Sequence, residues 1–160
     1  MAFDCFIKIG DIKGEAKDHA HKDEIDVLSW SWGVTQPGTM GMGGGGGGGK
    51  VNIQDLVFTK YIDTSSTNLY LKCCNGKHYE EAKLTVRKAG ETPVEYMKVH
   101  MEKVMVTGIS SGGSGSEDRV TENVQLNFKK VTVIYTPQGP DGSPQAEMDI
   151  GWDIEANQQL

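Results

Sequence analysis

The stretch from residue 124 to residue 135, VQLNFKKVTVIY, alternates apolar and polar residues but changes phase at its middle. The apolar residues are Val124, Leu126 and Phe128 before the change and Val131, Val133 and Tyr135 after it. Successive side chains of a β-strand point to opposite faces, so the change moves the buried side to the other face. One core can follow such a strand only if the strand bulges or bends there. The stretch therefore predicts a long, bent strand.

Two further segments of the chain show the same change of phase. In one, Ile25 and Val27 precede Leu28, Trp30 and Trp32; in the other, Met97, Val99 and Met101 precede Val104 and Val106. Shorter segments around residues 3–9, 82–87 and 148–155 alternate without a change. Long strands that turn a corner are typical of small barrels and orthogonal sandwiches. We therefore expect a mainly β fold, an antiparallel β-barrel or two-sheet sandwich.

One short helix is expected beside the strands, over residues 66–74. The preceding residues Asp63 to Ser66 offer several oxygens that can cap its first turn. Leu69 and Cys73 fall on one face, and Asn75-Gly76 supplies a left-handed stop. We expect this helix to flank the barrel and cover an open side.

Composition indicates one small domain spanning residues 1–160. The 16 basic and 22 acidic residues give a net charge of −6 without a basic cluster, which argues against nucleic acid as a partner. No apolar stretch reaches the length of a membrane-spanning helix, so membrane insertion is not expected. Asp4 and Lys8 interrupt the N-terminal segment where a signal peptide would be apolar, which predicts a cytoplasmic protein exported by another route.

Cys5, Cys73 and Cys74 are expected to be free and mostly buried thiols.

Catalytic or metal-binding constellations are scarce. His19 and His21 lie near carboxylates in the sequence, but a polar segment of this kind is usually only solvated. His78 follows the expected helix end, where a partly charged imidazole favours the helix dipole. The sequence contains no nucleophile elbow, and the glycine run ends in Lys50-Val51 instead of a phosphate-binding Gly-Lys-Ser/Thr. We predict no catalytic residues, no cofactor and no metal, and hence no enzyme.

An unbroken glycine run, Gly43–Gly49, separates two strand-like segments. Glycine loses the most backbone entropy on ordering, so such a run is expected to be mobile in a free subunit unless something outside holds it. We therefore interpret residues 36–50 as an extended glycine-rich loop that points toward a partner. This interpretation favours an assembly subunit.

A set of ordered sequence blocks resembles the hemolysin-coregulated protein (Hcp) family of bacterial type VI secretion. The blocks are Ile25–Gly33, the glycine loop, Phe58–Asp63, Gly76–Tyr79, Leu84–Gly90, Thr121–Phe128 and Gly151-Trp152. The resemblance covers nearly the whole chain. It implies a β-barrel subunit that forms hexameric rings, which stack into the inner tube of a contractile apparatus. It also implies contacts with the sheath and the tip spike, export to the extracellular space or a target cell, and small effector proteins carried in the lumen.

Physical requirements of such a subunit suggest where its contacts lie. A ring needs unlike edges of neighbouring copies to meet, and unpaired strand edges can provide the backbone bonds. Stacking needs a second contact, which we expect from the loop at residues 36–50, with Met40 and Met42 as its apolar anchors. The residues expected to take part in ring stacking are Gln36, Met40, Met42, Lys50, Gly90 and Asn157.

The lumen is expected on the polar side of the first tryptophan strand. If Leu28, Trp30, Trp32 and Val34 are buried, then Ser29, Ser31 and Thr35 face the passage together with Gly33. Ser31 is the foremost candidate for cargo contact, although an ordinary solvent-facing residue would fit the pattern equally well. An alternative function is a secreted β-barrel binding module, lectin-like and without a tube role. A stable monomer would favour the module, and a hexamer would favour the tube.

Overall fold

The structure is a computed structural model that describes residues 3–45, 47–90 and 93–160. The strands are β1 (Phe3–Ile9), β2 (Ile25–Asp26), β3 (Ser29–Ser31), β4 (Val34–Thr35), β5 (Asn52–Ile53), β6 (Leu56–Tyr61), β7 (His78–Lys88), β8 (Glu95–Gly112), β9 (Thr121–Tyr135), β10 (Met148–Asp153) and β11 (Gln158–Gln159). The helix is α1 (Ser66–Asn75). Over these described residues the fold is mainly antiparallel β with one helix, as the sequence predicts.

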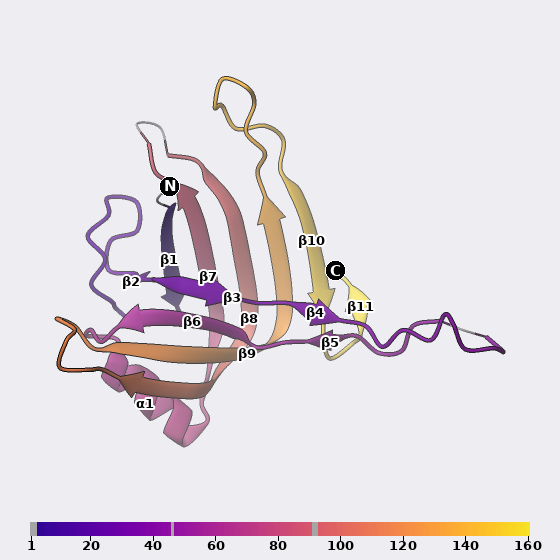
Figure 1. The fold of residues 1–160 in the computed structure, drawn as a ribbon, viewed down its shortest axis with the longest axis horizontal. Coiled ribbons are helices and arrows are strands. Elements are labelled where there is room, and N and C mark those ends of the chain that lie inside the picture. The colour runs from indigo at the N-terminus through magenta and orange to yellow at the C-terminus, as the bar shows by residue number, and fades with distance from the viewer. Residues whose placement is uncertain (1–2, 46, 91–92) are drawn as a thin grey trace.

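Two layers of strands cross at a steep angle, and β8 and β9 run through both (Figure 1). In the upright layer, β9 pairs with β10 and β8 pairs with β7, which continues to β1. In the other layer, the first half of β9 pairs with β6, and β6 pairs with β3. The long β8–β9 ribbon therefore joins the two layers of a sandwich.

The change of phase in β8 and β9 falls at the corner between the layers. Met101 and Val104 are both buried, and Lys103 between them has a left-handed backbone with φ of 55°. On the partner strand, Val131 lies opposite Met101 and Phe128 lies opposite Val104. Both strands thus shift their buried side at the same place, which confirms the predicted bend.

The segment around the tryptophans differs from the prediction. It is divided into β2, which pairs with β1, and β3, which pairs with β6. At the crossing, Val27 N–H donates to the Cys5 carbonyl and Leu28 N–H donates to the Thr59 carbonyl. These bonds bridge a barrel that strand pairing alone leaves open.

The expected burial of this segment was partly wrong. Leu28 and Val34 are 42% and 53% exposed, whereas Trp30 and Trp32 are half-buried and pack against the core. Leu28 lies where the chain passes from one layer to the other, and Val34 lies in β4, which pairs with β5 in a separate two-stranded sheet. Buried and exposed side chains alternate only within one continuous strand, and the predicted strand is divided into β2, β3 and β4.

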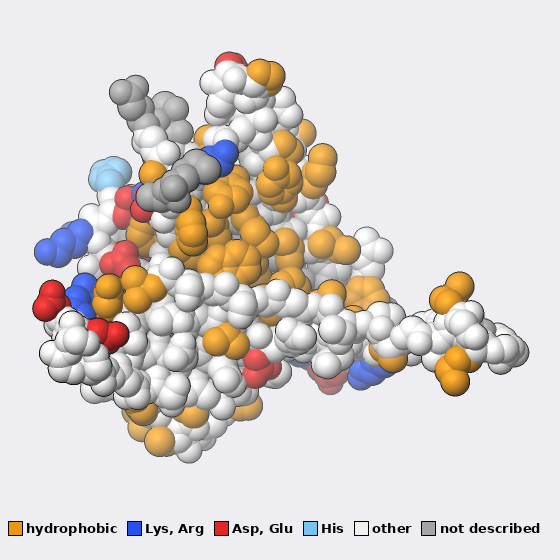
Figure 2. Space-filling view, in the orientation of Figure 1, with side chains coloured by type: hydrophobic (Ala, Val, Ile, Leu, Met, Phe, Trp, Pro, Cys, Tyr) orange, Lys and Arg blue, Asp and Glu red, His pale blue; other side chains and the backbone are white. Residues whose placement is uncertain are grey.

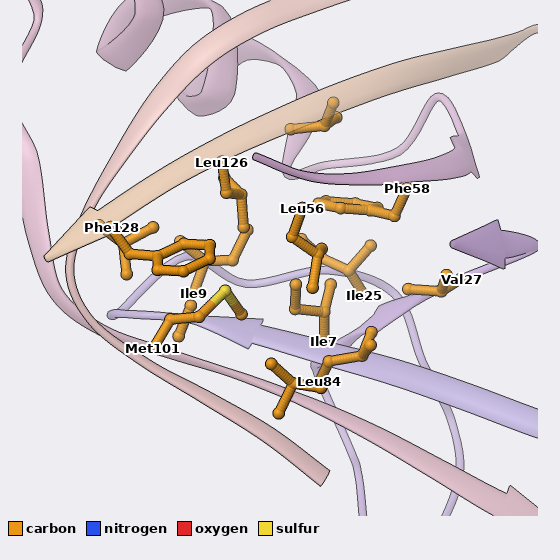
Figure 3. Packing of buried hydrophobic residues seen from close by; sticks show 14 of the residues in the cluster. Ile7, Ile9, Ile25, Val27, Leu56, Phe58, Leu84, Met101, Leu126 and Phe128 are labelled. Carbon is orange, nitrogen blue, oxygen red and sulfur yellow. The ribbon is translucent and has the colours of Figure 1, made fainter. Parts of the chain in front are cut away.

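The core fills the space between the layers (Figure 3). It draws Ile7 and Leu84 from the upright layer and Phe58 and Leu126 from the other, all fully or almost fully buried. Each apolar side chain removed from water contributes about 1.5–3 kcal/mol. Burial on alternate positions of these strands leaves their other faces free for contacts outside the subunit.

The helix is as predicted and one residue longer. Gly76 ends α1 with φ of 67°, and its N–H donates to the Lys72 carbonyl. Leu69 is buried, and α1 packs on β8. The start is held by Asp63, whose carboxylate accepts the Ser65 N–H at 2.8 Å.

A buried ionic network under this helix was missed at the sequence level. Lys60 on β6 and Glu122 on β9 are directly opposite each other, form an ion pair, and are both fully buried. Ser66 donates to Glu122 and accepts from the Lys60 ammonium at 3.1 Å, and Asp63 lies 3.1 Å from the same ammonium. The network ties the start of α1 to both strands.

Outside the upright layer, the loop at residues 11–24 is fastened by Arg87 on β7. The Arg87 guanidinium donates to both carboxylate oxygens of Asp18, at 2.6 and 2.9 Å, and to Asp4 at 3.0 Å. The ring of Phe6 contacts this guanidinium and stacks on the His21 imidazole. The hydrogen bonds from Arg87 lower the pKa of Asp18 to about 2.

This contact predicts a sensitivity to acid. Because the pKa of Asp18 in the folded protein lies below its ordinary value of 3.8, the contact stabilises the fold above that value and is lost as pH falls toward 2. Between about pH 4 and about pH 2, the thermal midpoint of the wild type should fall more steeply than that of Asp18→Asn. Asp149→Asn is the control, because Asp149 is exposed on β10 and makes no ion pair within the described ranges. Parallel curves for wild type and Asp18→Asn would contradict the prediction.

Candidate assembly and cargo surfaces

A polar row crosses the outer face of the layer formed by β3, β6, β9 and β8. Ser29 lies opposite Thr59, Thr59 opposite Asn123, and Asn123 opposite Ser110. Thr59 donates its hydroxyl hydrogen bond to the Asn123 amide oxygen at 2.7 Å. On the same strands these positions alternate with positions whose side chains face the core, so the row faces away from the core.

A second row runs beside it. Ser31 lies opposite Val57, Val57 opposite Gln125, and Gln125 opposite Gly108. None of the residues in the two rows carries an ionisable side chain. We call the two rows together the neutral face.

The carboxylate of Asp55 borders the neutral face. Asp55 accepts hydrogen bonds from the Thr107 hydroxyl at 2.7 Å and the Asn127 amide at 2.9 Å. Its charge is thus already engaged by neighbours on β8 and β9. The face presents hydroxyl and amide groups in preference to charges, which suits hydrogen bonding with a polar partner.

Of the predicted lumen residues, the structure brings Ser29 and Ser31 onto one face. Thr35 lies elsewhere, in β4, where it pairs with Asn52. The remaining members of the neutral face, on β6, β8 and β9, were not singled out from the sequence. The alternation of Asn123 and Gln125 with buried valine and leucine could have indicated them, but their neighbours across the strands could not be known.

The glycine-rich loop forms a long arm that projects from one end of the molecule (Figure 1). At its root β4 pairs with β5, and farther out Gly38 and Gly48 form an antiparallel bridge. Thr39 adds two hydrogen bonds to the backbone of Gly47, at 2.7 and 3.1 Å. The arm is therefore an extended, backbone-paired ribbon that points outward, in agreement with the predicted direction.

Met40 and Met42 lie in the outer part of the arm and are 83% and 70% exposed. Apolar side chains stand on its far end in Figure 2. Gln36 and Lys50, also expected to take part in stacking, are exposed nearer the root. The arm thus brings all four of these predicted residues onto one projecting element.

The other two predicted stacking residues lie on different turns. Gly90 follows β7, and Asn157 lies between β10 and β11, with a left-handed φ of 54°. Because β7 and β10 run in opposite directions in the upright layer, the turns after them lie at opposite ends of that layer (Figure 1). The structure therefore does not bring Gly90 and Asn157 together within one subunit.

At the root of the arm lies an apolar groove of about 280 Å³. Its lining residues are Val34, Gln36, Val51, Ile53, Val131, Val133, Ile150, Gly151 and Trp152. Hydrophobic side chains also gather on the surface above the arm in Figure 2. We call this site the root groove; sequence reasoning did not find it, because it joins four separate parts of the chain.

The imidazole of His21 is held by its neighbours in the structure. His21 lies between two carboxylates, with Nδ1 2.9 Å from Glu24 Oε2 and Nε2 2.6 Å from Glu95 Oε1. Among residues 3–45, 47–90 and 93–160, no group of three or more His, Cys, Asp or Glu side chains is arranged to hold a metal. The three cysteines are free, but only Cys5 is buried, so the expectation of mostly buried thiols was wrong. Burial raises the pKa of the Cys5 thiol to about 12.

Comparison with known proteins gives a consistent result. A family model described as "Type VI secretion system effector, Hcp" matches residues 6–135. Protein hcp1 of Pseudomonas aeruginosa is 59% identical over 161 residues, which cover 99% of this chain and 99% of that protein. The chain belongs to the Hcp family of type VI secretion proteins.

Solved structures of type VI secretion proteins share the fold of this Hcp chain. One, described as a type six secretion system protein, superimposes with a TM-score of 0.94 at 28% identity and covers 99% of this chain and 100% of that chain. Hcp1 from Salmonella typhimurium gives a TM-score of 0.82 at 35% identity over 100% of both chains. Within the described parts of the Hcp chain, no helix has the length and apolarity needed to span a bilayer.

Proposed function

We propose that this Hcp chain is the structural subunit of a type VI secretion inner tube. Hexameric rings of the chain stack into a tube, which is expelled when the surrounding sheath contracts and which carries small effector proteins in its lumen. The observation that carries the proposal is the end-to-end identity of 59% with Protein hcp1 of Pseudomonas aeruginosa. The subunit acts by assembly and not as an enzyme, in contact with sheath proteins and a tip spike. It begins in the cytoplasm and leaves the cell with the tube.

Open strand edges support lateral association. The terminal strands β2 and β11 are only two residues long, so they cover little of β1 and β10. On β1, only Phe6 and Ile7 are paired with β2 in register. Unpaired backbone groups on the remaining parts of these edges can bond to a neighbouring copy, and unlike edges that meet head to tail can close a ring.

Positions at opposite ends of the upright layer support stacking. The turn that holds Gly90 lies at one end and the turn that holds Asn157 lies at the other. When rings of the same orientation stack, one end of each ring meets the other end of the next. The two turns and the arm then provide the contacts between rings.

Native mass measurement of the purified chain tests the assembly. A hexamer of the 17.4 kDa subunit is the expected main species. Electron microscopy at increasing protein concentration should then show rings that stack end to end. A stable monomer at every concentration would reject the tube and favour a secreted binding module.

The neutral face supports the lumen assignment of Ser29 and Ser31. A passage for folded cargo is best lined by side chains that hydrogen-bond without strong charge, because a charged wall binds oppositely charged cargo too tightly to release it and repels cargo of its own sign. The hydroxyl and amide rows on β3, β6, β9 and β8 meet this requirement. Thr35 lies in β4 at the root of the arm and not on the neutral face. It is therefore proposed to contact cargo only where the arm borders the passage.

A bulky substitution at Ser31 tests this surface. Ser31→Gln should reduce cargo retention at least tenfold, because it covers the adjoining row, and should leave ring formation unchanged. Co-purification of a resident effector with the ring measures retention, and native mass measures the ring. Thr67→Gln is the control, because Thr67 is exposed on α1, away from the neutral face. Equal cargo binding by wild type and Ser31→Gln would reject the assignment.

A further inference from the structure

The two most exposed large apolar side chains in the described parts of the chain belong to the outer part of the arm. Met40 and Met42 are 83% and 70% exposed, and the next, Met148, is 64% exposed. Water-exposed methionines on a projecting ribbon gain free energy only if another surface covers them. The surface that covers them must lie outside their own arm, because the residues around them are mostly glycine.

The root groove has the properties of such a surface. It has room for about 280 Å³, and its lining residues include Val133, Ile150 and Trp152. None of its lining residues carries a charge, and neither does any residue from Gln36 to Gly49. Apolar, uncharged surfaces on both sides can associate without desolvating an ion. Methionine is flexible and polarisable, so it adapts to an irregular groove.

The arm of the same subunit cannot fill the groove in this structure. Gln36 lies at the groove, whereas Met42 lies up to about 20 Å farther out, at about 3.3–3.6 Å per extended residue. Figure 1 shows the arm pointing away from the layers, and the pairs Val34–Ile53 and Gly38–Gly48 hold it in that direction. If the methionines occupy such a groove, it therefore belongs to another copy of the chain.

We propose that Met40 and Met42 of one subunit insert into the root groove of a subunit in the adjacent ring. The inserted side chains pack against Val133, Ile150 and Trp152, and the glycines let the backbone approach the groove closely. The contact joins two different patches of identical chains, so it repeats from ring to ring without limit. This inference rests on the proposed stacking and adds the site that receives the arm.

Cysteine cross-linking between preformed rings tests the contact. Rings of Met42→Cys are mixed with rings of Ile150→Cys, both in a background of Cys73→Ser and Cys74→Ser, and oxidised under stacking conditions. Ile150 is 60% exposed, so its replacement leaves the core intact. In this mixture each ring carries only one of the two cysteines, so the Met42–Ile150 disulfide can form only between two different rings. We expect covalent dimers. Leu71→Cys on α1, where Leu71 is 56% exposed, replaces Ile150→Cys in the control and should give none.

Substitution in the groove gives a second measurement. Ile150→Asp should raise the concentration at which tubes form at least tenfold, since one buried apolar side chain is worth one to two factors of ten in affinity. Circular dichroism and native mass establish that the variant still folds and forms rings. Leu71→Asp should leave the concentration unchanged.

The outcomes separate this inference from the proposed function. Tubes that assemble from the cysteine variants without the Met42–Ile150 disulfide would overturn the groove assignment and leave stacking intact. A disulfide that forms in doubly substituted single rings before stacking would make the contact lateral and also overturn it. Wild-type rings that never stack would refute the proposed tube and this inference together.

Discussion

Replacing Glu122 by glutamine lowers the free energy of unfolding by about 3–5 kcal/mol. The substitution keeps the shape of the side chain but removes the anion that neutralises the buried Lys60 ammonium. Asp63, 3.1 Å from the same ammonium, remains as a weaker partner at the edge of the network. A charge without full compensation in the core is among the costliest defects a fold can contain. Urea unfolding at one fixed protein concentration measures the loss, because association changes apparent stability.

Two controls separate the buried charge from other effects. Glu80→Gln removes an ion pair with Lys103 in which the side chains are 75% and 50% exposed, and it should cost less than about 1 kcal/mol. The double substitution Lys60→Met with Glu122→Leu removes both charges and should recover most of the stability lost in Glu122→Gln. A loss below about 1 kcal/mol in Glu122→Gln would contradict the assigned burial of the pair.

The position of this pair links stability to the proposed function. Lys60 and Glu122 point into the core. Their neighbours in the sequence, Thr59 and Asn123, point the other way and belong to the neutral face. The ion pair also holds Ser66 at the start of α1. A defect in the network should therefore loosen the helix and the neutral face together.

Deleting Gly43–Gly49 should abolish long tubes and leave hexameric rings. The deletion removes the reach of the arm, whereas the lateral edges on β1 and β10 and the core remain unchanged. Electron microscopy counts tubes at concentrations where the wild type polymerises, and native mass confirms the rings. The expected change is from long tubes to single rings.

The chain offers a matched control in its other small-residue tract. Residues 113–116 lie in the exposed turn between β8 and β9 and are also glycine and serine. Their deletion shortens a loop of similar composition without changing the arm, so tubes should still form. Unimpaired polymerisation after loss of Gly43–Gly49 would reject the role of the arm in stacking.

Local patterns in the sequence determined the class of fold. Alternation along each strand has a period of two residues, and a change of phase such as that between Phe128 and Val131 can be found without knowing any partner strand. The same holds for α1, because the left-handed stop at Gly76 depends only on its immediate neighbours. The direction of the glycine arm could likewise be inferred from its lack of side chains.

Only the tertiary structure decided which residues meet. The burial of Lys60 and Glu122 could have been suspected from the sequence, since each continues the buried positions of its strand. Their pairing, however, requires the register between β6 and β9. The exposure of Leu28 follows from the crossing between layers, and the neutral face and the root groove each combine residues far apart in the chain. Side-chain alternation is a local property of the backbone, whereas strand register and layer crossing are set by the packing of the whole core. The sequence alone could therefore indicate faces and ends, but not the contacts made across them.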